Sequence, residues 1–238
     1  MDRTYRNWVG TDGLVTFTVS EKETDLFISA RKNLEKQAHT SVMHYREEIE
    51  SYIRKRRGFL GSLSPVDVEE EAPPIIKDMI CESRKAGVGP MATVAGAIAQ
   101  YVARALLPES SEIIVENGGD IFLKALSKKL VAIYVGDSIL NGKIALEIQP
   151  DETPLGICTS SGTVGHSLSF GKADAVVIYS DSAILADAVA TATCNLVKSH
   201  SDIEKGISFA RSINGVRGIA IIFGDKLGIW GGIKLAPR

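Results

Sequence analysis

The sequence contains little cysteine, no long apolar run and almost no excess charge. Its three cysteines, at 81, 158 and 194, form no Cys-x-x-Cys pair. They are too few and too widely spaced for a disulfide framework, so we expect reduced thiols. No run reaches the ~18 apolar residues that a membrane-spanning helix needs, and the polar N-terminus lacks an apolar core of signal-peptide length. We therefore expect a cytoplasmic protein with no membrane partner.

Composition indicates an ordinary globular chain of 238 residues with a net charge of −2. This size fits one domain over 1–238, or two intimately packed halves, and the softest internal boundary is predicted at 58–74, where glycines, prolines and acidic residues gather. The near-neutral charge argues against a broad surface for nucleic acid. No Gly-x-Gly-x-x-Gly follows an early strand, which argues against a dinucleotide-binding Rossmann fold.

Apolar periodicity predicts an α/β (α+β) fold with strands followed by paired helices. An N-terminal hairpin over 14–19 and 25–30 precedes a long charged helix over 31–56. Further helices are predicted at 75–86, 91–107, 182–199 and 202–213. Further strands are predicted at 112–116, 121–125, 129–136, 142–149, 174–180, 217–223 and 227–233.

The first candidate motif is Asn117–Asp120, which lies between two apolar runs. Gly118 and Gly119 permit a tight turn whose backbone can approach a ligand closely. Asp120 at the exit could hold a ribose, an amine or a metal. The alternative is a plain hairpin turn, because Asn-Gly is a strong hairpin signal.

The second motif is a segment rich in hydroxyls and glycines between 156 and 171. Thr159, Ser160, Ser161 and Gly162 offer hydroxyls and backbone amides that suit phosphate oxygens. His166 follows and is the residue best able to move protons near neutral pH. The alternative is a polar surface loop with a solvated histidine.

The third motif places Asp187 and Thr191 four residues apart in an apolar stretch. On a helix this spacing puts both oxygens on one face, with Asp181 or Ser182 as the N-cap. A carboxylate there needs a partner, and Mg²⁺ held by carboxylate, hydroxyl, carbonyl and substrate phosphates would supply it. The alternative is that Asp187 pairs with a basic side chain and Thr191 bonds back to the carbonyl at 187.

A fourth candidate is the start of the helix predicted after Pro90. Backbone amides around Gly89 and Met91 would form an anion site at this N-terminus, where the helix dipole favours a phosphate. The alternative is simple helix packing, because small residues recur at 92, 95, 96, 97 and 99.

Together, the order Gly-Gly-Asp, Ser-Gly followed by His, and Ala-Asp-Ala with Thr four residues after the Asp resembles the ApbE-like superfamily of flavin-handling proteins. The strings at 89–97 and 116–120 resemble a divergent branch of it. The resemblance implies a T-fold-like architecture, with a mostly antiparallel sheet packed against helices. It also implies Mg²⁺-dependent transfer of FMN from FAD onto a protein threonine.

Carried over by position, the resemblance assigns metal ligation to Asp187 and Thr191 and a functional role to His166. Gly118, Gly119 and Asp120 match its turn near the nucleotide, and a metal-binding carbonyl is expected within 87–92. The chain departs from the family after His166, where Ile-Asp-Pro-x-Thr-Gly is missing.

Two other functions stay open. Cys158, beside the hydroxyl-rich segment, and Cys194, on the helix of Asp187, could serve sulfur chemistry, because some relatives in anaerobes are linked to sulfide assimilation into homocysteine. The alternative is that both are buried small hydrophobes. The chain could also be a non-catalytic flavin or nucleotide module. We expect a homodimer, since T-fold relatives commonly associate through their sheets.

Overall fold

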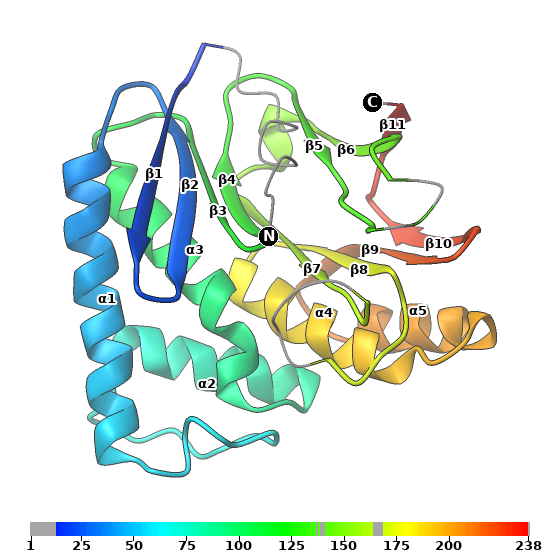
Figure 1. Cartoon of the computed structure of the whole chain (residues 1–238), viewed down its shortest axis with the longest axis horizontal. Coiled ribbons are helices and arrows are strands. Elements are labelled where there is room, and N and C mark those ends of the chain that lie inside the picture. Colours follow the sequence, from blue (N-terminus) through cyan, green and yellow to red (C-terminus); the bar gives the residue numbers. More distant parts are fainter. Residues whose placement is uncertain (1–12, 137, 139–140, 164–168, 238) are drawn as a thin grey trace.

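The computed structural model describes residues 13–136, 138, 141–163 and 169–237. Figure 1 shows the arrangement of the elements. The strands are β1 Val15–Glu21, β2 Thr24–Ala30, β3 Ile113–Asn117, β4 Asp120–Lys124, β5 Lys129–Ala132, β6 Ile144–Ile148, β7 Leu155–Ser160, β8 Ala175–Ser180, β9 Val216–Phe223, β10 Lys226–Gly231 and β11 Leu235–Pro237. The helices are α1 Glu35–Lys55, α2 Pro74–Ala86, α3 Val94–Leu106, α4 Ala183–Leu196 and α5 Ile203–Arg211.

Eight strands form one sheet in the order β1-β2-β3-β4-β7-β8-β9-β10. Neighbouring strands in this sheet run antiparallel. A second, three-stranded sheet has the order β11-β6-β5. The predicted mostly antiparallel sheet packed against helices is therefore confirmed.

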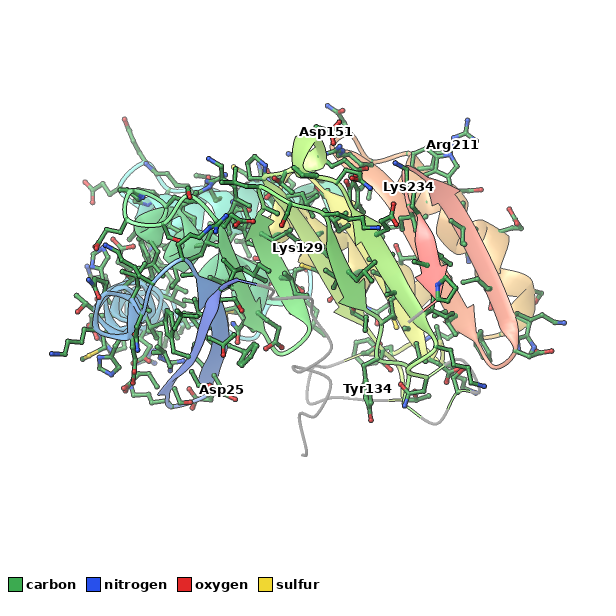
Figure 2. All side chains as sticks on the ribbon, turned by 90° about the horizontal axis from the view of Figure 1, so that it is seen from above. Asp25, Lys129, Tyr134, Asp151, Arg211 and Lys234 are labelled. Atoms are coloured by element: carbon green, nitrogen blue, oxygen red, sulfur yellow. The ribbon has the colours of Figure 1, made fainter. Side chains whose placement is uncertain are left out.

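Alternating side chains divide the large sheet into two apolar faces, as the two-residue period of a strand requires. On β4, Phe122 faces the core beneath the helices, whereas Ile121 and Leu123 face the core beneath the small sheet. Figure 1 shows α1 beside β1 and β2, and α4 and α5 beside β7 to β9. In Figure 2, Lys129 on β5 and Lys234 just before β11 mark the small sheet.

The predicted elements agree with the structure apart from two strands. The N-terminal hairpin pairs Val15 through Glu21 with Ala30 through Thr24. Ser182 is the N-cap of α4, accepting the Leu185 N–H at 3.3 Å. The hydroxyl-rich segment is corrected at its start, because 155–160 is strand β7, paired with β4 and β8. The short β11, which pairs with β6, was not predicted.

Candidate metal and nucleotide site

One cavity brings together several of the predicted site residues. It has a volume of about 560 Å³ and lies between α4, the segment leading into α3 and the loop that follows α1. Asp120, at the start of β4, lines it together with Asp187 and Thr191 of α4. Gly89 and Met91 also line it. We call it the carboxylate cavity.

Asp187 is held in place by the first turn of α3. The Gly96 backbone N–H donates to Oδ2 of Asp187 at 3.0 Å. A β-carbon at position 96 would lie 2.4 Å from the Ala183 carbonyl oxygen, so only glycine fits where α3 meets α4. The first-turn amides of a helix favour an anion, and here Asp187 itself accepts one of them.

The start of α4 is fixed by α3 in turn. The side-chain oxygen of Gln100, which is buried in α3, accepts the Ala183 N–H at 2.8 Å. Two reciprocal contacts therefore join the helices, because α3 also donates from Gly96 to Asp187. This arrangement sets the position of Asp187 relative to the cavity and, one turn later, that of Thr191.

Both carboxyl groups are strongly desolvated. Burial, helped by the charge of Glu116, raises the pKa of Asp120 to about 7, although contacts with the Cys158 thiol and the Thr159 N–H oppose the shift. Burial also raises the pKa of Asp187, and the charge of Asp120 is the second cause of this shift. The charge of Asp120 thus disfavours ionisation of Asp187 unless a cation lies nearby.

The donor set fits a hard cation. Asp120, Asp187 and Thr191 present oxygen atoms, and no Lys, Arg or His among the described residues lines this cavity. Mg²⁺ is held in proteins by one or two carboxylates with substrate phosphates completing its shell. No cluster of three His, Cys, Asp or Glu side chains suited to a metal occurs within the described residues. Any Mg²⁺ bound here would therefore need the Thr191 hydroxyl and oxygens of a bound substrate in addition to the two carboxylates.

The Gly-Gly turn supports the cavity from outside. Gly118 and Gly119 have φ angles of 66° and 108° in the turn between β3 and β4, a conformation that favours glycine. The side-chain amide of Asn117 donates to the Ala95 carbonyl at 3.1 Å and thereby joins this turn to α3. Neither glycine lines the carboxylate cavity. The two glycines therefore form a hairpin turn, as the alternative interpretation of this motif expects. The turn places Asp120 at the cavity.

The hydroxyl-rich segment does not line the carboxylate cavity. Thr159 and Ser160 lie in β7, and Ser160 is buried. Gly162 donates its N–H to the Ala173 carbonyl at 2.9 Å, and Ser161 accepts the Thr163 N–H at 3.1 Å. Their polar groups thus serve local structure, and phosphate binding by them stays a prediction. His166 lies outside the described residues.

Cys158 and Cys194 are both fully buried. Burial raises the pKa of Cys158, as do the charges of Asp120 and Asp187, and its thiol donates to the Ala183 carbonyl at 3.2 Å. Burial likewise raises the pKa of Cys194, which accepts a hydrogen bond from the Ser169 hydroxyl at 3.2 Å. A reactive thiol is exposed and has a lowered pKa, so these surroundings favour the packing role of both cysteines.

Sequence reasoning overlooked the partners that shape the cavity. In the sequence Gly96 is one of several small residues, and its contact with Asp187 joins residues far apart in the chain. Asn195 and Phe170 also line the cavity. Asn195 lies one turn after Thr191 on α4, so helical spacing could have identified it.

A family model described as "AbpE bacteria" matches residues 6–213. The UPF0280 protein MJ1526 of Methanocaldococcus jannaschii is 40% identical over 218 residues, covering 89% of this chain and 88% of that protein. The UPF0280 protein MK0206 of Methanopyrus kandleri is 42% identical over 217 residues, covering 88% of each.

Solved structures show the same fold at low identity. The flavin transferase ApbE from Vibrio cholerae aligns with a TM-score of 0.61 and 16% identity, covering 92% of this chain and 96% of that one. The apo flavinyl transferase ApbE of Pseudomonas stutzeri aligns with a TM-score of 0.59 and 13% identity, covering 92% and 94%. Within the part of the chain that the structure describes, no helix combines the length and apolarity needed to cross a membrane.

Proposed function

Because the chain belongs to the family described as AbpE bacteria, we propose that it binds a flavin nucleotide, FAD or FMN, together with Mg²⁺ in the carboxylate cavity. We further propose that it transfers the FMN group of FAD to a hydroxyl acceptor. The observation that carries the proposal is the convergence of Asp120, Asp187 and Thr191 on a cavity whose described lining contains no cationic side chain. A diphosphate placed among these carboxylates needs a cation between them.

The chain's own residues have distinct roles in this proposal. Asp120, Asp187 and Thr191 would hold the cation, and the Gly96 amide keeps Asp187 aimed at it. Bound Mg²⁺ would supply neutralisation of phosphate charge. The acceptor oxygen would form a bond to the FMN phosphorus as the diphosphate bond breaks and AMP leaves. His166 would accept the proton of the acceptor hydroxyl.

The proposal is supported by the fold shared with two flavin transferases and by the donor set of the cavity. Burial of both candidate cysteines gives the sulfur-assimilation alternative no comparable support. The homodimer and the cytoplasmic location stay predictions. A module that binds flavin without catalysis would share the binding site but would lack transfer activity.

Isothermal titration with FAD, with and without Mg²⁺, tests the binding step. We expect Mg²⁺-dependent binding by the wild type and its loss in Asp187→Asn, which keeps the side-chain shape but removes the charge. Asp181→Asn is the matched control, because Asp181 precedes the same helix, is exposed and pairs with Arg217 instead. Equal FAD affinity in Asp187→Asn and the wild type would contradict the metal assignment.

A transfer assay tests the catalytic step. The protein is incubated with FAD, Mg²⁺ and a threonine-containing acceptor protein, and covalent flavin is followed by fluorescence after denaturing electrophoresis. Binding without covalent transfer would favour the non-catalytic module.

A further inference from the structure

The first strand, β1, lies at an open end of the large sheet. Within the described residues it pairs with β2 and with no other strand, and its register is continuous from Val15 to Glu21. An edge strand presents backbone N–H and C=O groups that can pair with a further strand. Natural sheets usually deter such pairing with lysine, proline or glycine in the edge strand, or with a very short strand.

The other three sheet edges in the described part of the chain have such features. β10 begins with Lys226 and contains two glycines, of which Gly231 has a φ angle of 85°. β5 has four residues and carries Lys129, and β11 has three residues and ends at Pro237. In contrast, β1 has seven residues with no lysine, arginine, proline or glycine, and its one charged residue is Glu21 at the end. β1 is therefore the edge that the sequence leaves open to pairing.

The hairpin turn determines which backbone groups of β1 face this open edge. A two-residue turn joins β1 to β2, so the closing pair, Glu21 and Thr24, exchanges hydrogen bonds. Such pairs alternate along an antiparallel ladder, so Thr16, Thr18 and Ser20 direct their N–H and C=O groups away from β2. All three residues are exposed. Their backbone groups are therefore accessible to an added strand.

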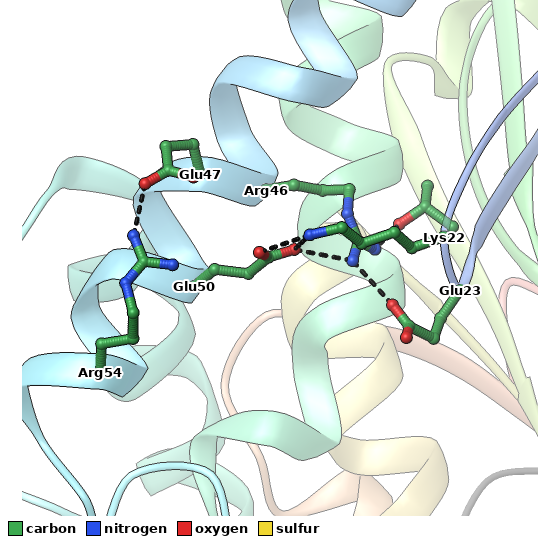
Figure 3. Close-up of polar contacts among 7 residues, drawn as sticks. Lys22, Glu23, Arg46, Glu47, Glu50 and Arg54 are labelled. Carbon is green, nitrogen blue, oxygen red and sulfur yellow. Dashed lines mark hydrogen bonds and ion pairs between the residues drawn. The ribbon is translucent and has the colours of Figure 1, made fainter.

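Ion pairs hold the hairpin against α1, as Figure 3 shows. Lys22, in the turn, contacts Glu50 of α1 at 2.8 Å. Arg46 contacts the same carboxylate at 2.8 Å and Glu23 at 2.7 Å, and it donates to the Thr24 hydroxyl at 2.6 Å. The open edge is therefore fixed in position, so a strand that binds there does not have to order it first.

A groove with a volume of about 550 Å³ follows the last part of this edge, between β1 and the start of α1. Val19 lines it from the strand, and Glu35, Lys36 and His39 line it from the helix. Glu21 lies beside the groove, 3.8 Å from Nε2 of His39. Two carboxylates and one ammonium group thus surround the groove when the histidine is neutral. This balance favours a cationic side chain.

We propose that β1 is a docking edge for an extended segment of a partner protein that carries lysine or arginine among β-branched residues. The segment adds as a further strand whose backbone pairs with Thr16, Thr18 and Ser20, while a basic side chain enters the groove. The charges favour this segment over a second copy of the chain. If two β1 strands paired about Thr18, each Glu21 would face a Val15, and β1 has no cation to offer the groove. This inference does not depend on the proposed function.

Labelled heptapeptides with blocked ends test the docking edge. The first alternates threonine and valine and has a lysine at each end. The second replaces both lysines by glutamate, and the third keeps the lysines but has proline at its centre. Fluorescence anisotropy measures their binding to the full chain, and we expect the second and third to bind at least about tenfold more weakly than the first. No binding of the first, or equal binding of either of the others, would overturn the proposal.

Hydrogen exchange followed by NMR locates the bound strand. The first peptide should slow exchange of the Thr16, Thr18 and Ser20 amides at least about tenfold. The amides of Phe17 and Val19 should be unchanged, because they face β2. Slow exchange of the three outward amides in the free protein would show that the edge is already covered and would overturn the proposal.

A pair of variants tests the same contact from the side of the protein. Thr18→Pro removes an outward N–H and leaves the ladder to β2 in place, and Thr18→Val is the matched control that keeps the N–H. The proline variant should bind the first peptide at least about tenfold more weakly, and the valine variant should bind it like the wild type. Equal binding by both variants would contradict the proposal. Thermal unfolding checks both folds, and the peptide series and amide exchange decide if the proline variant does not fold.

Sedimentation of the wild type tests the alternative occupant. A dimer that is lost in Thr18→Pro would assign the edge to a second copy and would overturn the proposal. None of these measurements uses FAD or Mg²⁺, so their outcome is separate from that of the proposed function.

Discussion

The backbone N–H of Gly96 donates to Oδ2 of Asp187, so the first turn of α3 orients the central carboxylate of the carboxylate cavity. A β-carbon at position 96 would lie 2.4 Å from the Ala183 carbonyl oxygen and 3.0 Å from Cβ of Asp187. The two helices therefore pack together only because position 96 carries no side chain.

Gly96→Ala should destabilise the protein and weaken Mg²⁺-dependent FAD binding. Alanine is better than glycine inside a helix by about 1 kcal/mol, but the clash with α4 should exceed that gain. Thermal unfolding and FAD titration measure the two effects. Gly58→Ala is the control, because a β-carbon there meets nothing within 4 Å. A higher melting temperature for Gly96→Ala would contradict the prediction.

Ionisation of Asp120 should make the stability of the metal-free protein depend on pH. Burial raises its pKa from 3.8 to about 7, so between these values the folded state keeps a proton that the unfolded state has lost. The proton that the folded protein retains on Asp120 therefore stabilises the fold. This stabilisation is present in full below pH 3.8 and is lost as the pH rises through about 7. Urea unfolding of the wild type and Asp120→Asn should therefore differ by an amount that changes across this range. A constant difference would argue against the shift.

Mg²⁺ affinity should change with pH in the opposite sense to this stabilisation. A cation binds the carboxylate and not the carboxylic acid, so affinity should rise with pH through about 7, where Asp120 ionises. Titration of Mg²⁺ in the presence of FAD at several pH values measures this. Flat affinity across that range would show that Asp120 is not a ligand.

The three thiols should differ sharply in reactivity. Cys81 is exposed, whereas Cys158 and Cys194 are buried. A disulfide reagent should therefore modify one thiol per chain quickly in the native protein and all three after denaturation. Cys81→Ser should abolish the fast reaction. Rapid modification of either remaining thiol in that variant would revive the sulfur hypothesis.

A buried ion pair beside the small sheet should contribute to the stability of the fold but not to FAD binding. Lys129 and Glu112 contact each other at 3.6 Å, and each side chain is only 2% exposed. Lys129→Met should destabilise the fold, but by less than the about 3 kcal/mol expected for an unpaired buried charge, because the Glu112 carboxylate keeps its ion pair with Arg31 and the Leu126 N–H. Lys128→Met, at an exposed neighbouring position, is the control and should cost little. FAD affinity should be unchanged in both variants.

His166 should contribute to transfer rather than to binding. His166→Gln should keep Mg²⁺-dependent FAD affinity and lower the transfer rate at least about 100-fold, as expected for loss of a general base. His200→Gln is the control, because His200 packs against Phe223 and does not line the carboxylate cavity. An unchanged rate in His166→Gln would remove the proton-transfer role.

Local patterns in the sequence predict most of the elements. The alternation in β1 and the apolar spacing of α4 are visible within single segments, and the Asn-Gly signal marks the turn before Asp120. β7 was harder to predict, because its last residues, Thr159 and Ser160, carry hydroxyls that are also typical of a loop. Its identity as a strand depends on pairing with β4 and β8 on either side.

Local spacing in the sequence predicts that two members of the candidate site share a helix face, but it does not reveal the residues that hold them in place, and the roles of the site residues stay predictions. The spacing of Asp187 and Thr191 places both on one face of α4, and their location in one cavity agrees with that expectation. The contacts from Gly96 and Gln100 join helices distant in sequence, and no local period encodes them.

The small sheet of β5, β6 and β11 covers the face of the large sheet turned away from the helices, and none of its residues lines the carboxylate cavity. Exposed lysines flank its strands, with Lys128 just before β5 and Lys234 just before β11. A dye or a solid support attached through this side would leave the ligand face open. Surface-based binding measurements on the protein can therefore use this side for attachment.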